Sequence, residues 1–156
     1  MLKDLLLIIP AYNEEDNIQK VVEDLVKNFS QYDYIIVNDG SKDSTADICR
    51  KHGYNMVDLP VNIGLSGAFQ TGLKYAYCMG YKYAMQYDGD GQHKAEYIES
   101  MLNEVRTDYD IVIGSRFVNK KKDMSFRMIG SRLISAAIRL TTGCHIKDPT
   151  SGMRIY

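Results

Sequence analysis

Short apolar segments alternate along the chain with longer segments in which apolar residues recur every three or four positions. The short segments end at turn-forming residues and predict buried strands over residues 5–9, 34–37, 55–59, 82–87 and 111–113. The longer segments predict amphipathic helices over residues 18–29, 44–52, 65–76, 97–105 and 129–138. Strands and helices joined by such short connections are typical of a doubly wound α/β fold. We therefore expect a mostly parallel, Rossmann-like sheet with helices on both faces.

Local signals at the helix ends agree with this division. Asp16 and Gln19 have the spacing of a capping box, which predicts that the first helix begins beside them. Gly53 follows the second helical segment and predicts its end. No repeat or linker interrupts the pattern, so we expect one domain over residues 1–156.

Composition narrows the class of protein. With 156 residues, 45% of them hydrophobic, the chain can bury a core. Residues 5–9 are too few to cross a bilayer, and the proline and polar residues that follow them are unlike a signal peptide. The three scattered cysteines include no CxxC pair, which argues against a disulfide framework or a zinc site and favours a reducing, cytoplasmic setting.

Charge is distributed unevenly. Residues 1–115 contain 10 basic and 18 acidic side chains, whereas residues 116–154 contain 9 basic and 2 acidic ones. The basic segment predicts contact with an anion, such as a phosphate ligand, an anionic lipid or nucleic acid, or else a solvated helical surface.

Ligands of open α/β sheets bind beyond the carboxyl ends of the strands, so the five strand-to-helix junctions are the candidate site. Their sequences are PAYNEED, NDGSKDS, VNIGLSGA, DGDGQH and GSRF. The first lacks G-x-G-x-x-G and the chain lacks G-x-x-x-x-G-K-[ST], which excludes a dinucleotide-binding domain and a P-loop NTPase. Tyr12 and Glu14 could hold a nucleobase or form a helix-capping loop. Asp39 could accept a base N–H or cap the next helix.

Phosphate chemistry is indicated by the later junctions. Asp88 and Asp90 suit a hard divalent ion such as Mg²⁺ or Mn²⁺, although an Asp-Gly turn would look the same. The glycine-bearing loop at residues 62–68 opens a helix, where backbone N–H groups can face phosphate. Arg116 could pair with phosphate or with a surface acid.

In order along the chain, PAYNEE, VNDGSKDST, NIGLSGAFQTG, YDGDGQH, IVIGSRF and DPTSGMR resemble the motifs of glycosyltransferase family 2, which has the GT-A fold. The resemblance extends from Pro10 to Arg154. Within the family the chain looks most like the bacterial branch related to dolichol- and undecaprenyl-phosphate sugar transferases. This resemblance implies an inverting transfer of a sugar from a nucleoside-diphosphate sugar, with Mg²⁺ or Mn²⁺ as cofactor.

The same resemblance implies a role for each matching residue. Nucleotide-sugar binding falls to Pro10, Tyr12, Glu14, Asn38, Asp39, Gly67, Asp88 and Asp90. Metal binding falls to Asp88, Asp90 and Gln92, and catalysis to Asp148 and Arg116. Asp148 would act as general base on an acceptor hydroxyl, or would orient groups around a phosphate acceptor. Alternatively, it caps a turn ahead of Pro149.

The expected partners are the donor and a polyprenyl phosphate or glycan acceptor, at the cytoplasmic face of the membrane and without nucleic acid. Asn38-Asp39 stands where many relatives have two aspartates, which leaves the base selectivity open. Relatives continue beyond DPTSGMRIY, so we expect the chain to be truncated on the acceptor side. A nucleotide-sugar binding module without turnover is the alternative. A sugar-nucleotide nucleotidyltransferase would need a Gly-rich basic loop where PAYNEED stands.

Overall fold

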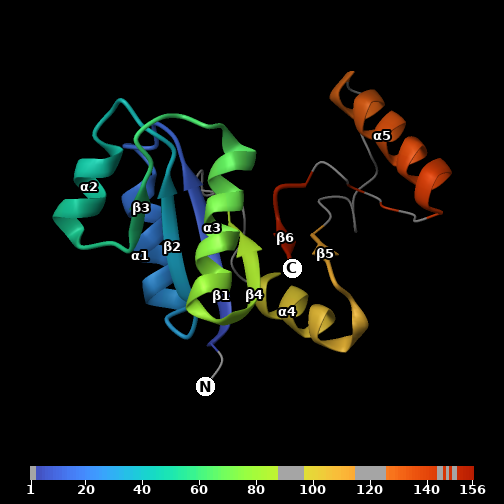
Figure 1. Ribbon diagram of the computed structural model, residues 1–156, viewed down its shortest axis with the longest axis horizontal. Helices are drawn as coiled ribbons and strands as arrows, with labels where there is room; N and C mark the ends of the chain where they lie inside the picture. Colours follow the sequence, from blue (N-terminus) through green and yellow to red (C-terminus); the bar gives the residue numbers. More distant parts are fainter. Residues whose placement is uncertain (1–2, 88–96, 115–125, 144–145, 147, 149–150) are drawn as a thin grey trace.

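A six-stranded sheet forms the centre of the protein, with the strand order β3-β2-β1-β4-β6-β5 (Figure 1). The computed structural model describes residues 3–87, 97–114, 126–143, 146, 148 and 151–156. Neighbouring strands among β1 to β4 are parallel, whereas β6 is antiparallel to both β4 and β5. The strands are β1 (Lys3–Ala11), β2 (Asp33–Asn38), β3 (Met56–Asp58), β4 (Tyr81–Gln86), β5 (Val112–Ile113) and β6 (Arg154–Ile155).

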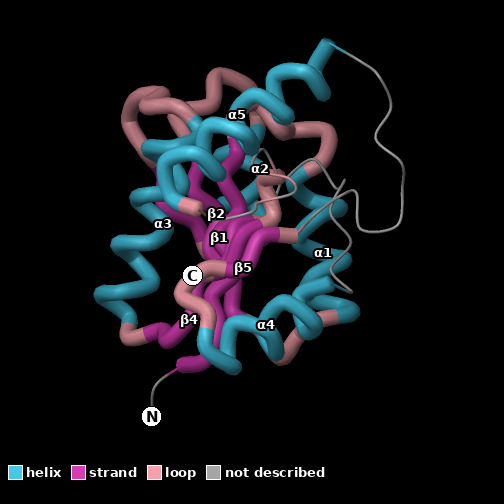
Figure 2. Tube along the Cα trace, turned by 90° about the vertical axis from the view of Figure 1, so that its right-hand side faces the viewer, coloured by secondary structure: helices cyan, strands magenta, loops and turns pink. Residues whose placement is uncertain are grey.

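Helices cover both faces of this sheet. The helices are α1 (Ile18–Asn28), α2 (Thr45–His52), α3 (Leu65–Met79), α4 (Tyr97–Asp108) and α5 (Phe126–Thr142). Figure 2 shows the sheet between α3 on one side and α1 and α4 on the other. The predicted mostly parallel α/β sheet with helices on both faces is confirmed.

The central strand β1 is apolar without interruption from Leu5 to Ile9 because both of its faces are buried. Successive side chains of a strand point to opposite faces. Leu5, Leu7 and Ile9 therefore pack with the apolar faces of α1 and α4. Leu6 and Ile8 point the other way and pack in the cluster that α3 covers. Since both faces are covered, every position of this strand is buried from Leu5 to Ile9.

The strand β6 was not predicted, and it completes the sheet on the side away from β3. Ala84 and Tyr156 exchange two backbone hydrogen bonds, with N···O distances of 3.1 and 3.0 Å. On the other side of β6, the N–H of Gly114 donates to the carbonyl of Met153 at 2.9 Å. The C-terminal residues thus lie between β4 and β5 and bring the segment before them to the carboxyl end of β4.

One predicted helix end is confirmed and one predicted helix start is wrong. Gly53 ends α2 in the left-handed conformation with φ of 66°. The first helix, however, has Asn17 as its N-cap, and the Gln19 side chain donates to Glu23 rather than to the backbone before the helix. The carbonyl of Glu14 accepts the N–H groups of Asn17 and Ile18, so a backbone turn replaces the expected capping box.

Helix α5 lies apart from the strands, on the side of β5 and β6 (Figure 1). Leu140 is 87% exposed and Ile134 is 47% exposed, so the second half of α5 presents apolar side chains outside the core. No helix in the described ranges is both long and apolar enough to cross a membrane.

The close approach of α3 to β1 at Gly72 yields a stability prediction. A Cβ added at Gly72 of α3 would lie 2.3 Å from Cγ2 of Ile8 in β1. We expect Gly72→Ala to destabilise the fold by about 1–3 kcal/mol despite the better helix propensity of alanine, because the helix must move away from the sheet. Urea unfolding measures this change. Gln70→Ala, on the exposed side of the same helix, should shift stability by less than about 0.5 kcal/mol. Equal stability of Gly72→Ala and the parent would contradict the close approach.

Candidate functional site

The loops that follow β1 and β2 are joined by reciprocal hydrogen bonds. The β1–α1 loop comprises residues 12–17 and the β2–α2 loop comprises residues 39–44. Backbone N–H groups of the first loop donate to side chains of the second loop and of α2: Asn13 to Ser41 at 2.9 Å, Glu14 to Thr45 at 2.8 Å, Glu15 to Asp43 at 3.1 Å. In return, Lys42 donates to Asn13 and Ser44 donates to Glu15, both at 2.9 Å. The two loops therefore form one unit at the carboxyl ends of β1 and β2.

Asn13 sets the path of the first loop. Its φ of 55° lies in the left-handed region, where asparagine is tolerated better than most residues. Both its backbone N–H and its side-chain oxygen are bonded to the second loop. This turn leaves the neighbouring Tyr12 42% exposed, while Glu14 is half-buried with its N–H held by Thr45. Hydrogen bonds to the second loop and to Thr45 thus fix the backbone that carries Tyr12 and Glu14.

Asp43 anchors the start of α2. Its Oδ1 accepts the Thr45 N–H at 3.0 Å and the Thr45 hydroxyl at 2.6 Å, and its Oδ2 accepts the Glu15 N–H. Burial on its own raises the pKa of this carboxyl, but the hydrogen bonds from Thr45 and Glu15 outweigh that effect and lower the pKa below its usual value. The group is therefore ionised at neutral pH and favours the N-terminal end of α2.

Asp39 bridges to the third junction. Only 3% of its surface is exposed; its N–H donates to the Ala11 carbonyl at 2.8 Å, and its Oδ1 accepts the Ile63 N–H at 2.8 Å. Of the two alternatives for Asp39, capping of the next helix does not describe the observed contact, because Asp43 accepts the N–H at the start of α2. Its Oδ2 makes no hydrogen bond within the described part of the chain, which leaves one acceptor for a ligand.

Glycines allow the β3–α3 loop to approach this unit. Gly40 has φ of 62°, and a Cβ there would lie 2.6 Å from the backbone of Val61 and Asn62. Gly67 lies in the first turn of α3, where a Cβ would meet the Ile63 side chain at 2.8 Å. The loops after β1, β2 and β3 consequently pack together at one edge of the sheet.

Asn38 lies behind these loops. It is 1% exposed, and its side-chain amide donates to Oδ1 of Asp58 at 2.6 Å. Its side-chain oxygen accepts the hydroxyl hydrogen of Ser41. Pro10 is the second-to-last residue of β1 and pairs in register with Val37 of β2, the residue before Asn38.

Asp148 reaches the same edge from the opposite end of the chain. The antiparallel pairing of Met85 with Ile155 directs the residues before β6 past the carboxyl end of β4. Asp148 is 1% exposed, and its carbonyl accepts the Ser151 N–H at 3.2 Å. Asp148 thus lies buried near the carboxyl end of β4. A buried carboxylate must have polar partners, because burial without them costs free energy.

Four predicted residues, Asp88, Asp90, Gln92 and Arg116, lie outside the described residues. Tyr87, immediately before the acidic pair, donates its N–H to the Ile8 carbonyl at 2.8 Å, which extends β4 along β1 toward the three loops. Burial, with a smaller contribution from Asp24, raises the pKa of the Tyr87 hydroxyl. Within the described ranges, no group of three or more His, Cys, Asp or Glu side chains could hold a metal ion.

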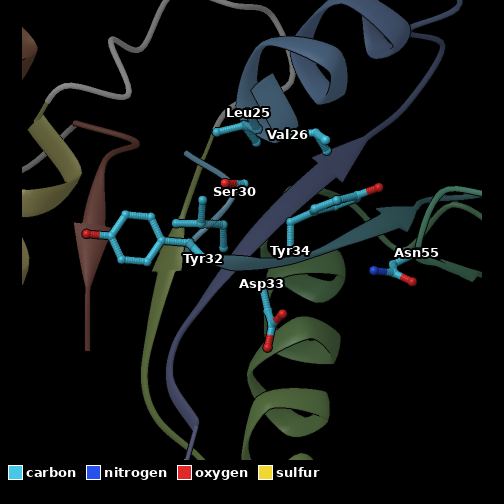
Figure 3. A pocket seen from close by; sticks show the side chains of 8 residues that line it. Leu25, Val26, Ser30, Tyr32, Asp33, Tyr34 and Asn55 are labelled. Atoms are coloured by element: carbon cyan, nitrogen blue, oxygen red, sulfur yellow. The ribbon is translucent and has the colours of Figure 1, made fainter. Parts of the chain in front are cut away.

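The described part of the structure contains two cavities, and one of them adjoins the candidate loops. This cleft of about 740 Å³ is lined by Asn38, by residues of the β2–α2 and β3–α3 loops, and by Arg50 and Asp58. A smaller cavity of about 200 Å³ lies at the amino-terminal end of β2. Figure 3 shows Leu25 and Val26 of α1 above Tyr34 in this second cavity. It is at the end of the strand opposite to the candidate loops.

Sequence reasoning missed the residues that join the loops. Asn13 carried a signal, since asparagine in a tight junction often marks a left-handed turn. Asp43 also carried one, because it precedes a helical segment by two positions. Asp58 carried none, because its partner Asn38 is 20 positions away in the sequence.

The sequence of this chain is similar to those of known proteins. The family model described as glycosyl transferase family 2 matches residues 6–156. A UDP-N-acetylglucosamine–dolichyl-phosphate N-acetylglucosaminyltransferase of Methanococcus voltae is 35% identical over 99% of this chain and 69% of its own length. A polyprenol monophosphomannose synthase of Mycolicibacterium smegmatis is 30% identical over 97% of this chain and 60% of its own.

A solved structure has the same fold. Glucosyl-3-phosphoglycerate synthase from Mycobacterium tuberculosis, in complex with Mn²⁺, UDP-glucose and phosphoglyceric acid, superposes with a TM-score of 0.70 at 21% identity. The match covers 98% of this chain and 56% of that one. This chain therefore spans between 56% and 69% of the length of these three proteins. The family model and the identity to its members show that the chain belongs to glycosyltransferase family 2.

Proposed function

We propose that the chain is the donor-binding and catalytic core of an inverting glycosyltransferase that transfers a sugar from a nucleoside-diphosphate sugar to a polyprenyl phosphate. The observation that carries the proposal is the unit formed by the loops after β1 and β2, which holds Tyr12, Glu14 and Asp39 at one edge of the sheet. Ligands of open α/β sheets bind at this edge.

Two features of this unit bind the nucleobase of the donor. The exposed Tyr12 ring offers a flat apolar face for a nucleobase. The Asp39 oxygen that is not bonded to Ile63 offers an acceptor for a base N–H. Uracil presents such an N–H, and the solved neighbour holds UDP-glucose while the M. voltae relative is named for a UDP-sugar. We therefore favour a uridine nucleotide as donor.

The metal falls to Asp88, Asp90 and Gln92. Their donors are all oxygen atoms, which suit Mg²⁺ and Mn²⁺ rather than softer metals. A bound divalent ion would neutralise charge on the diphosphate. The solved neighbour contains Mn²⁺ together with its nucleotide sugar, which supports this cofactor.

The reaction needs little proton transfer when the acceptor is a phosphate. An acceptor oxygen forms the bond to the anomeric carbon from the face opposite the leaving group, and the bond to the diphosphate oxygen breaks, so that the configuration inverts. The acceptor is already an anion, and Asp148 would orient it or stabilise positive charge that develops on the sugar. Arg116 would face the phosphates. The names of the M. voltae and M. smegmatis relatives, which refer to dolichyl-phosphate and polyprenol, support this acceptor class.

The basic segment extends the same proposal. Residues 116–154 contain 9 basic side chains and 2 acidic ones, a balance that favours contact with anionic lipid at the cytoplasmic face of a membrane. A second candidate is a nucleotide-sugar binding module that binds the donor and transfers no sugar. The described groups that remain available, the Tyr12 ring and one oxygen of Asp39, favour donor binding in either case.

The role of Asp39 is tested by two variants of one residue. Asp39→Ala should destabilise the fold by about 1–3 kcal/mol, because the Ile63 N–H loses its acceptor. Asp39→Asn keeps an oxygen for Ile63 but can replace the free acceptor with a donor, so it should retain most of the stability and still weaken uridine binding about tenfold. Urea unfolding and uridine titration measure the two effects. Uridine binding by Asp39→Asn at parental affinity would refute the base contact.

The metal proposal is tested at Asp90. Asp90→Asn should abolish the part of UDP binding that depends on Mn²⁺ and leave metal-free uridine binding unchanged, since the base is held by other loops. Isothermal titration with and without Mn²⁺ measures this difference. Glu96→Gln, which removes a nearby charge that the proposal does not use, is the matched control. If Asp90→Asn binds UDP and Mn²⁺ as the parent does, the metal assignment is wrong.

The acceptor proposal is tested with the full-length protein. It should transfer sugar from a UDP-sugar to a polyprenyl phosphate, and Asp148→Asn should lower kcat by about two orders of magnitude with little change in UDP affinity. Radiolabelled sugar in extracted lipid measures the transfer. Donor binding without transfer by the full-length protein would favour the second candidate.

A further inference from the structure

A chain of hydrogen bonds runs behind the donor-facing loops, from α2 through β3 and β2 to the β1–α1 loop. Arg50 of α2 donates to Oδ2 of Asp58. The other oxygen of Asp58 accepts the Asn38 side-chain amide at 2.6 Å. The Ser41 hydroxyl donates to Oδ1 of Asn38 and accepts the Asn13 N–H at 2.9 Å. These five residues form one continuous path, which we name the Asn38 relay.

We propose that the Asn38 relay is a positioning device for donor binding, in which Asn38 touches no ligand and instead fixes the left-handed turn at Asn13. This inference rests on the proposed function and goes beyond it. It makes Arg50 and Asp58, which are distant from the donor-facing groups in the sequence, determinants of how Tyr12 and Glu14 are held.

The first argument is that both ends of the Asn38 side chain are already paired within the protein. It is 1% exposed, its N–H₂ group faces a carboxylate, and its oxygen faces a hydroxyl. A buried amide in this position must have both of its ends paired.

The second argument is the chemistry of position 38. Asp58 supplies two acceptor oxygens, one for Arg50 and one for residue 38. Asparagine offers a donor to Asp58 and an acceptor to Ser41 at the same time. An aspartate would place two carboxylates at the 2.6 Å contact, where like charges repel each other. Asparagine at position 38 therefore suits the carboxylate of Asp58.

The third argument is the coupling to the loops. The Asn13 N–H at the end of the relay belongs to the residue with φ of 55°, and a strained turn persists only where the surroundings hold it. The backbone of Asn38 contributes as well, since its carbonyl accepts the Leu59 N–H at 2.9 Å. The relay thus ties β3 to the turn that presents Tyr12.

An Asn38→Asp variant converts the relay into a pH-dependent one. At low pH the two carboxyl groups share a proton, and the protonated group can donate as the amide does. As pH rises, the shared proton is lost and the contact between the two carboxylates becomes repulsive. The charged groups around position 38 are Asp58 from β3 and, from the β2–α2 junction and α2, Asp39, Lys42, Asp43, Asp47 and Arg50.

The experiment compares UDP affinity of Asn38→Asp with that of the parent at each pH, with Mn²⁺ present. The ratio of the two dissociation constants should be near one at about pH 5.5 and rise to about ten or more at about pH 8, because the relay breaks only when both carboxyls ionise. Taking the ratio at each pH removes the titration of UDP itself.

Two further variants separate positioning from general damage. Asn38→Asp combined with Asp58→Asn places a donor and an acceptor back in the contact and should restore a pH-independent ratio near one. Asn55→Asp makes the same chemical change at an exposed position before β3 and should leave the ratio at one throughout. A ratio that stays flat for Asn38→Asp, or a step that the double variant does not remove, overturns the relay.

Hydrogen exchange of residues 12–17 keeps this test independent of the proposed function. Relative to the parent at the same pH, Asn38→Asp should lose protection in this loop as pH rises, and the double variant should regain it. If the parent binds no UDP, the proposed function fails while the exchange result still decides the relay. Unchanged protection in Asn38→Asp overturns it.

Discussion

The hydrogen bonds between the loops after β1 and β2 are the interaction on which the candidate site depends. Loop and helix-start N–H groups have no partners within their own strand or helix, and buried ones must find acceptors elsewhere. Here each loop supplies them to the other, through Ser41, Asp43 and Thr45 in one direction and Asn13 and Glu15 in the other. Neither loop can shift alone, so the surface between them behaves as one rigid body.

This arrangement separates the groups that face a ligand from the groups that support them. Tyr12 and one oxygen of Asp39 remain available at the edge of the sheet. Other side chains form hydrogen bonds within the protein. Asn38, for example, is bonded to Asp58 at one end and to Ser41 at the other. Binding geometry in such a site is set before a ligand arrives, which reduces the entropy lost on binding.

Much of the fold followed from the sequence because burial leaves local traces. Strands covered on both faces are apolar throughout, as in β1, and helices with one buried face show a periodic stripe, as in α1. The strand β6 leaves no such trace, because it has two residues and its partners lie in β4 and β5.

In the candidate site, too, some residues could be predicted from the sequence and others could not. The junctions identified Tyr12 and Asp39 as candidates from residue type and position. Their supports could not be predicted, because the bond from Asn38 to Asp58 crosses 20 positions and the bond from Asn13 to Ser41 crosses 28. The expected capping box at Asp16 failed for a related reason. The left-handed Asn13 and the turn at Glu14 had already fixed where α1 begins.

The place of β6 in the sheet also orders events during synthesis on the ribosome. The strand pairings among the four parallel strands are complete once β4 has emerged, whereas one face of the sheet still waits for α4 and β6. In the described sheet β5 lies at the edge beyond β6, so it must wait for residues translated some forty positions later before it gains a neighbour. Nascent chains would thus form the parallel strands and the loops after β1 and β2 first, and Asp148 would reach its position only as β6 is inserted.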